Sequence, residues 1–460
     1  MSDSGGVVRD VSWRDLCPWL MLTRTFALAT SVQVLLAALL AVTLTPIGWQ
    51  IGDRLLLVSD DTLAQKERAE VFPLIESHTQ WPGNRAIPDT PRAIEPVRGS
   101  LPVTQGGLQM APWQTAPIRP IDGVFEYFAA PFQYLFAPCL TWRKGLFIFG
   151  GAIWTLLVWC VPGAIITRAA ALQFGREEPL DWDQAFTFAG KKWTSYLIAP
   201  LVPLAGVFAL AMLLAISGWI MRIPVIGPIG VGAMWFLSLL LGFMMALLLL
   251  GLLFGWPLMW ATIGSESSDA FDALSRSNAY TFQRPFFYLF YVLFSALLGY
   301  LGWLLVWQFT EAVIALTHWG IAWGLSEEYL RTAMLADNSS TAPFYANWSL
   351  SLIHFWEGLV RAIATSFSFT FFWCSAVGWY LLLRREVDQM EIDEVAVDEP
   401  EEKFTLPKLK PHASGVPTVE PTPTSPIKEG PVAHVPPLPP TATPTTPPIP
   451  PADSPPPAGP

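Results

Sequence analysis

The chain has 460 residues, of which 52% are hydrophobic and only 14% are charged. A soluble protein normally carries about a quarter charged residues, so this composition argues against a soluble enzyme or a soluble binding domain. The net charge of −10 comes largely from nine acidic residues between Glu386 and Glu402, so it says little about the rest of the chain. The four cysteines are far apart, and they predict neither a disulfide framework nor a zinc site.

The N-terminus differs from a cleavable signal peptide. Residues 1–25 are polar and mixed, and the apolar run that follows them, 26–49, is 24 residues long. The hydrophobic region of a cleaved signal has only about 7–15 residues. We therefore expect a cytoplasmic segment over 1–25 and an uncleaved signal anchor over 26–49.

Long apolar runs recur along the chain, and each exceeds the roughly 20 residues that cross about 30 Å of hydrocarbon. The predicted spans are 26–49, 145–167, 196–217, 229–261, 286–309 and 359–383. The fourth is overlong and contains Pro257, which predicts a kink or a break. The fifth can continue as far as Gly324. The fold class predicted is an all-α multi-pass membrane protein, with a helical bundle over 145–383.

Lysine and arginine near the span ends indicate the orientation, because cytoplasmic loops are enriched in them. With the N-terminus inside, the inner residues are Arg9, Arg14, Arg24, Arg168, Arg176, Lys191, Lys192, Arg276, Arg284, Arg384 and Arg385, and the outer ones are Arg54, Arg143, Lys144, Arg222 and Arg361. Arg143 and Lys144 are an exception to the trend. The bias predicts a cytoplasmic (inner) membrane protein with both termini in the cytoplasm.

Two segments are predicted outside the cytoplasm, a loop over 50–144 and a shorter segment over 310–358. The loop is rich in proline and has no sustained helix or strand period. Its last part, 121–140, is aromatic, but Pro131 and Pro138 argue against a span. We expect an interfacial or re-entrant segment there.

The C-terminal tail, 384–460, is first acidic and then proline-rich: from residue 407 onward, 20 of the last 54 residues are proline. Such a segment buries too little apolar area to offset its ordering entropy, so we expect a disordered cytoplasmic tail. Pro436, Pro437, Pro439 and Pro440 form overlapping PxxP patterns. Two interpretations are open: docking of a polyproline helix into an aromatic groove of a cytoplasmic protein, or a solvated spacer.

Two cytoplasmic amphipathic helices are predicted, over 181–195 and 269–284. Each begins with an aspartate suited to a helix N-terminus, and Asp181 with Gln184 is similar to a capping box. Each then leads through basic and aromatic residues into the next span; we expect Lys191, Lys192, Trp193, Arg284 and Phe286 to lie at the lipid headgroups. The two hairpins are either parallel duplicates or two ordinary interfacial helices.

The pattern of an acidic helix start, a basic and aromatic turn and then Tyr-Leu before a span occurs over Asp269 to Leu289 and over Asp181 to Leu197. In this it resembles a loose set of uncharacterised bacterial multi-pass membrane proteins. The resemblance covers residues 145–385. It implies a helical membrane bundle, and it carries over no activity.

Ionisable residues near the last two spans are candidates for a function, because charge at membrane depth is costly. Glu311 and His318 are seven residues apart, and His354, Glu357 and Arg361 share one helix face. The two sets predict a proton- or ion-coupling cluster if they face each other. The alternative is an interfacial position with a local Glu357–Arg361 pair.

Gly251 and Gly255 form a GxxxG pattern, which permits close approach of helices; packing within the chain is favoured over a dimer face. No catalytic, metal or nucleotide motif is present, so the sequence predicts neither an enzyme nor a cofactor nor nucleic-acid binding. Two functions remain open. One is a membrane-embedded assembly or envelope factor that lies in the lipid bilayer and recruits a cytoplasmic protein through its tail. The other is a transporter or permease.

Overall fold

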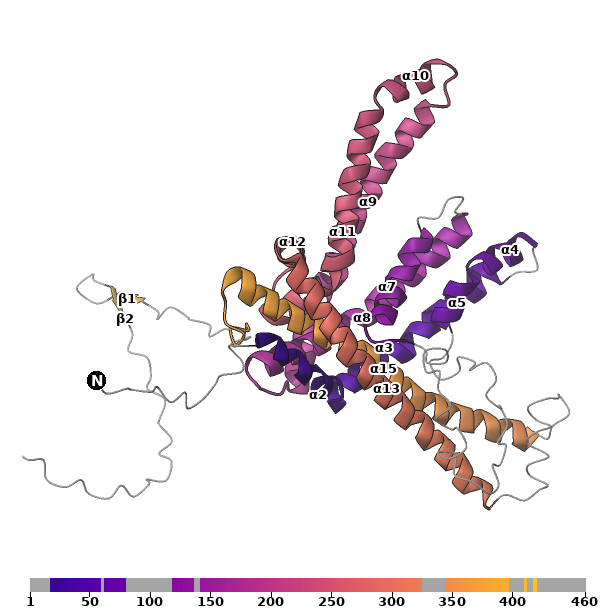
Figure 1. Ribbon diagram of the computed structural model, residues 1–460, viewed down its shortest axis with the longest axis vertical. Coiled ribbons are helices and arrows are strands. Elements are labelled where there is room, and N and C mark those ends of the chain that lie inside the picture. Colours follow the sequence, from indigo (N-terminus) through magenta and orange to yellow (C-terminus); the bar gives the residue numbers. More distant parts are fainter. Residues whose placement is uncertain are drawn as a thin grey trace, which may run out of the picture. The chain divides into compact units, whose positions relative to one another are not determined.

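The computed structural model describes residues 17–58, 62–79, 118–135, 141–324, 344–396, 409–411 and 417–419. These residues are overwhelmingly helical (Figure 1). Six helical segments are long and apolar enough to cross a membrane: Val32–Leu57, Trp142–Gly175, Trp182–Ile220, Trp235–Glu266, Pro285–Ile321 and Ser351–Asp388. The predicted fold class, a helical multi-pass membrane protein with about six spans, is confirmed.

The first span begins later than predicted. A 3₁₀ helix, η1 (Pro18–Arg24), and a short helix, α2 (Thr25–Ala29), precede it. Ser31 is extended, with φ −64° and ψ 137°, so α3 (Val32–Gly52) starts only after it. A π-helical turn, η2 (Asp53–Leu57), then continues the span.

Two short helices, α4 (Thr62–Glu70) and α5 (Phe72–Thr79), lie within the predicted loop 50–144. Ion pairs connect this region to the spans. Arg68 binds the Asp53 carboxylate through two bonds of 2.9 Å, and the Lys144 ammonium pairs with Glu70. The Lys144 charge, an exception to the orientation rule, is therefore neutralised within the protein.

The aromatic segment 121–140 contains α7 (Asp122–Leu135), a helix of about 21 Å, too short to cross a membrane. The Ser368 hydroxyl donates to the carbonyl of Ile118, just before α7, over 2.7 Å. The Phe128 ring contacts the rings of Trp159, Trp256, Trp260, Phe369 and Trp373. The first half of α7 therefore packs among the long helices, with Val124 and Phe128 buried.

The two predicted amphipathic helices differ in the structure. Residues 181–195 and the predicted third span form one continuous helix, α9 (Trp182–Ile220), which corrects the prediction of two elements. By contrast, α12 (Ala270–Gln283) and α13 (Pro285–Ala322) are separate, because Arg284 between them is not helical and Pro285 lacks an amide hydrogen. Asp181 and Asp269 both precede their helices. Only Asp269 caps with its side chain, at 2.8 Å from the Asp272 amide.

The remaining spans also differ in their bounds. The predicted span 229–261 is divided at Met234 into α10 (Ile226–Ala233) and α11 (Trp235–Glu266), and Pro257 lies inside α11 without ending it. The described residues of the predicted outer segment 310–358 are largely helical, since α13 extends through Ala322 and α15 (Phe344–Asp388) starts well before 359. The second span is α8 (Trp142–Gly175).

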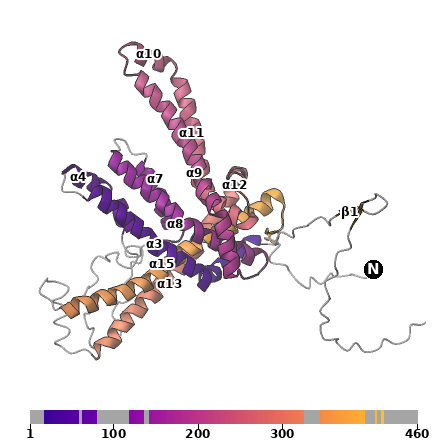
Figure 2. The ribbon, with the colours of Figure 1, turned by 180° about the vertical axis from the view of Figure 1, so that it is seen from behind.

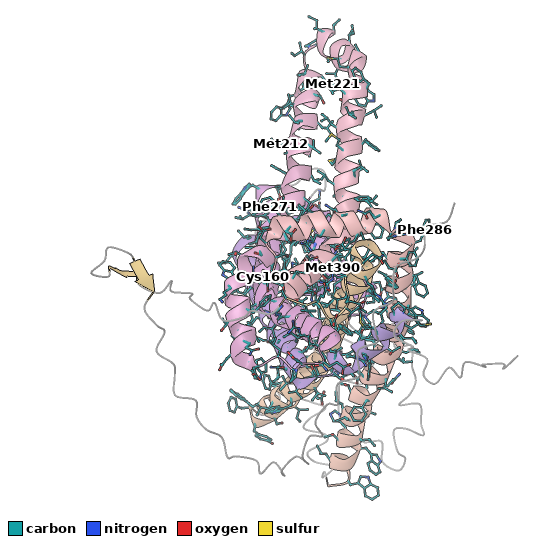
Figure 3. The ribbon with its side chains drawn as sticks, turned by 90° about the vertical axis from the view of Figure 1, so that its left-hand side faces the viewer. Cys160, Met212, Met221, Phe271, Phe286 and Met390 are labelled. Carbon is teal, nitrogen blue, oxygen red and sulfur yellow. The ribbon has the colours of Figure 1, made fainter. Side chains whose placement is uncertain are left out.

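The core lies around the second half of α15. Every residue in the most apolar 18-residue window of this helix is buried, and α3, α8, α11 and α13 pack against it. The α9–α11 hairpin is largely exposed, and Figure 3 shows Met212 and Met221 far along it, away from Cys160 in the packed region. Figures 1 and 2 show α13 and α15 running side by side from that region.

Residues 398–460 form a separate unit. Its described residues are two short antiparallel strands, β1 (Leu409–Pro411) and β2 (Pro417–Val419), in which Leu409 is opposite Val419. The sequence did not predict these strands. The four prolines predicted to dock, Pro436, Pro437, Pro439 and Pro440, lie outside the described residues. Of the predicted disordered tail, 384–460, the structure describes residues 384–396, 409–411 and 417–419.

Candidate functional site: a polar anchor at the base of the tail

The acidic segment directly after α15 folds back onto the bundle. We call residues 389–396 the tail root. The Ala396 amide donates to the Ser265 carbonyl over 3.0 Å, and Val395 is buried against Gly175 at the end of α8. Gln389 starts the return with a left-handed backbone, φ 59°, a conformation that commonly ends a helix. The base of the predicted free tail is therefore part of the packed membrane body.

Arg168 of α8 is the first arginine that holds the tail root. Its side chain is buried and donates to the Gly264 carbonyl over 3.1 Å and to the Ala396 carbonyl over 2.7 Å. Its guanidinium lies over the Phe188 ring, 4.9 Å from the ring centre. A cation suits the carbonyl end of α11, where the helix dipole is negative. One side chain thus connects α8, α9, α11 and the tail root.

Arg384 is the second arginine that holds the tail root. It is 1% exposed, so its charge needs partners within the protein. It donates to the Glu391 carbonyl of the tail root over 2.9 Å and to the Glu266 carboxylate over 3.3 Å. Glu266 also accepts from the Tyr380 hydroxyl and from Arg276 of α12. The carboxylate at the end of α11 therefore gathers donors from α12 and α15.

Tyr280 of α12 adds a further contact at the end of α15, where its hydroxyl donates to the Asp388 carboxylate. Burial, together with the nearby negative charge of Asp388, raises the pKa of Tyr280 above its ordinary value. The phenol therefore stays protonated and remains a donor. We call Arg168, Glu266, Tyr280 and Arg384, with their partners, the tail anchor.

The sequence did not identify this site. Arg168 and Arg384 entered the sequence analysis only as orientation signals, and Glu266, Tyr280, Tyr380 and Asp388 were not singled out. Glu266 was the only indication in the sequence, because this carboxylate directly follows a long span that contains no charged residue. Its partner Arg384 lies 118 residues further along the chain, a distance that spacing alone does not bridge.

The predicted coupling residues meet between α13 and α15. Arg361 binds the Glu311 carboxylate through two bonds, of 2.9 and 3.2 Å, and lies 3.6 Å from Glu357. The His318 ring nitrogen is hydrogen-bonded to Glu357 as well. Among the described residues, no hydrogen bond joins His354 to these four. We call Glu311, His318, Glu357 and Arg361 the outer cluster.

The outer cluster lies far from the tail anchor along α15. Arg361 precedes Arg384 by 23 residues, a distance of about 35 Å in a helix, which exceeds the roughly 30 Å of a bilayer core. Both carboxylates meet Arg361, and Glu357 is also hydrogen-bonded to His318, so each carboxylate has a partner within the group. This arrangement suits a clamp between two helices at the far boundary of the span.

The residues predicted at lipid headgroups fall into two groups. Lys192 is not free, since it donates to the carbonyls of Ser267 and Ser268 at the end of α11. The others, Lys191, Trp193, Arg284 and Phe286, are exposed.

Gly251 and Gly255 face α12, and a Cβ on them would lie 2.8 and 3.2 Å from the Asn278 side-chain oxygen. The GxxxG pattern therefore faces a helix of the same chain.

The two hairpins of the proposed repeat share one contact. In the first, the Tyr196 hydroxyl is hydrogen-bonded to Thr167 of the preceding span over 2.6 Å. In the second, the Tyr288 hydroxyl donates to the Phe254 carbonyl of the preceding span over 2.7 Å. Thr167 precedes Asp181 by 14 residues, and Phe254 precedes Asp269 by 15. This correspondence is consistent with a duplication.

Comparison with known proteins adds no second source of evidence on function. The chain matches no family model, no curated protein and no solved structure.

Proposed function

We propose that this protein is a membrane-embedded assembly or envelope factor that recruits a cytoplasmic protein through its C-terminal tail. The proposal places it in the cytoplasmic (inner) membrane with both termini in the cytoplasm. The observation that carries it is the tail anchor, in which two buried arginines bind backbone carbonyls of the tail root.

A passive spacer needs no such anchor. Burying an arginine is costly unless its charge and its donors are satisfied, and here Arg168 and Arg384 are satisfied partly by the tail root itself. An anchored base fixes the point where the tail leaves the bundle. The segment from Val397 to Pro436 then spans at most about 140 Å at 3.6 Å per residue. A partner bound there stays close to the inner membrane face.

The alternative is a transporter or permease with a pathway through the bundle. The outer cluster favours it, because facing carboxylates with a histidine are suited to proton coupling. The position of the cluster at the far boundary, and the partner that each carboxylate has within the cluster, favour the assembly role. Cysteines scanned through Gly242–Pro257 discriminate the two, since reaction with a polar thiol reagent would indicate a hydrated pathway.

Affinity purification from gently solubilised membranes tests the proposal. Three proteins are compared: the full chain, a truncation after Pro400, and the full chain with Arg168→Met, which removes one anchor. We expect partners that are lost with the truncation and reduced with Arg168→Met. Identical eluates from the full chain and the truncation would contradict recruitment. Partners unaffected by Arg168→Met would keep recruitment and remove the role of the anchor.

A further inference from the structure

A groove lies between α11, α12, α13, α15 and the start of α7, and its lining residues differ from those of the tail anchor and the outer cluster. Its volume is about 510 Å³, within the range of roughly 300–1,000 Å³ typical of small-molecule sites. The walls are almost entirely apolar. They include Leu250, Leu253, Phe254, Leu289, Val292 and Trp379.

The groove opens where the bilayer covers the protein. Three of its walls are membrane-spanning helices, and the lining residues Leu253, Leu289 and Phe286 are 45%, 50% and 84% exposed. Figure 3 shows Phe286 at the edge of the molecule, at the start of α13. Hydrocarbon chains therefore surround the opening, so an occupant enters from the lipid phase and is itself apolar where it contacts these walls.

The groove begins at the inner end of the span. On α13 its lining extends from Pro285 to Val292, about 10 Å of helix, and Thr281 of α12 lies at the same inner end. Asp122, an exposed residue of the lining, is paired with Arg119 over 2.6 Å. The groove is therefore short enough to lie within one leaflet, and the carboxylate in its lining already has a cationic partner.

A cation, Arg284, lies beside the inner end of the groove. Arg284 directly precedes Pro285, is exposed, and forms no ion pair with any residue that the structure describes. Its guanidinium lies 6.0 Å from the centre of the Phe287 ring, and its long side chain reaches the headgroup level. A basic residue there complements a phosphate of an anionic lipid.

We propose that this groove binds one acyl chain of an anionic phospholipid, with the lipid phosphate held at Arg284. The acyl chain matches the apolar walls, and the phosphate matches the unpaired cation at the headgroup level. The site would make the protein sensitive to the anionic lipid content of its own leaflet.

Native mass spectrometry of the full-length protein in mild detergent tests the proposal, with phosphatidylglycerol or phosphatidylcholine added. Leu289→Trp fills the groove and is expected to reduce retained phosphatidylglycerol at least about tenfold. Leu293→Trp is the matched control, since Leu293 is exposed on α13 and is not part of the lining. Equal retention by the two variants would mean ordinary surface lipid and would overturn the proposal.

Arg284→Gln tests the phosphate contact, with Arg222→Gln in the α9–α10 turn as the charge control. We expect the first variant to lose its preference for phosphatidylglycerol over phosphatidylcholine and the second to keep it. Leu289→Ala enlarges the groove and is expected to retain the lipid. Loss of lipid in Leu289→Ala, an unchanged preference in Arg284→Gln, or a copurifying polypeptide displaced by Leu289→Trp would each contradict the proposal.

Discussion

At the scale of single residues, buried arginines distinguish an anchored tail from a free one. Arg168→Met removes the donors to Gly264 and Ala396 while it keeps much of the apolar volume. Hydrogen bonds from charged donors contribute about 1.5–3 kcal/mol each, so we expect a loss of about 2–3 kcal/mol after relaxation. Thermal unfolding in detergent measures the stability, and cleavage after Glu391 or Glu394 by a glutamate-specific protease reports release of the tail root.

Arg176→Met is the matched control for that substitution. Arg176 is exposed, and its bond to the Val395 carbonyl is long, 3.4 Å. A surface change of this kind normally alters stability by less than about 0.5 kcal/mol. Equal effects of the two substitutions would show that Arg168 has no special role in the anchor.

Tyr280 gives the anchor a predicted pH dependence. The pKa of its phenol is raised in the folded protein, first by burial and then by Asp388, so folding favours the neutral form. Its contribution is complete below the ordinary tyrosine pKa of about 10 and is lost as the pH rises through the higher folded value. Tyr280→Phe removes the hydrogen bond to Asp388, which lowers the stability by about 1 kcal/mol. It also removes the phenol, so the loss of stability that this group causes at alkaline pH is absent.

Thermal unfolding of the wild-type protein and of Tyr280→Phe, at pH 8 and pH 11, checks the expectation. The wild-type protein is predicted to be the more stable at pH 8, and its advantage is predicted to shrink or reverse at pH 11. Apart from Tyr380, whose ring contacts that of Tyr280, the other tyrosines are common to both proteins and cancel in the comparison. Parallel losses of stability in the two proteins would contradict the role assigned to Tyr280.

At the scale of elements, the glycines of α11 set how closely α12 approaches. A Cβ at Gly251 would lie 2.8 Å from the Asn278 oxygen, whereas a Cβ at Gly242 has no atom within 4 Å. Overpacking costs about 1–3 kcal/mol, so Gly251→Leu is expected to lower the unfolding temperature while Gly242→Leu leaves it nearly unchanged. Cross-linking of the purified protein checks the alternative: a loss of dimers with unchanged stability would favour an interface between copies.

The outer cluster makes a second prediction at this scale, for the pairing of α13 with α15. Arg361→Met leaves the carboxylates of Glu311 and Glu357 without their shared cation, so it is expected to destabilise the protein by about 3–5 kcal/mol. Glu311→Gln is expected to cost less, because Glu357 still pairs with Arg361. A double-mutant cycle of these two substitutions measures the coupling, expected at about 0.5–3 kcal/mol. Additive effects would mean that the two side chains do not stabilise each other.

The outer cluster and the tail anchor show which contacts could be predicted from the sequence and which could not. Helical periodicity placed His354, Glu357 and Arg361 on one face, and it left open whether Glu311 and His318 face them. The tail anchor joins α8, α11, α12 and α15, and its contacts depend on how four spans pack. The number of spans was predicted correctly because the length of an apolar run is a local property of the sequence. The helix ends were not, because Ser31 and Met234 interrupt helices without a proline to mark the break.

At the scale of the whole molecule, six spans require both ends of the chain to lie on the same side of the membrane. Arg168, Arg384 and Lys192 belong to that side, where their charges bind carbonyls at the ends of helices. In the proposed orientation this side is the cytoplasm, as the positive-inside rule predicts, although these three side chains bind carbonyls and are not available to lipid.

Single cysteines test this topology in a protein whose four natural cysteines are replaced. We expect a cysteine at Ser4 or Ser414 to be protected from a membrane-impermeant maleimide in intact cells, and one at Thr104, in the segment between α5 and α7, to react. Permeabilised cells provide the control, because all three positions are then expected to react. Reaction at Ser4 but not at Ser414 would mean an odd number of spans, and then the α9–α11 hairpin would be the first element to re-examine, since it is the least packed of the six-span body.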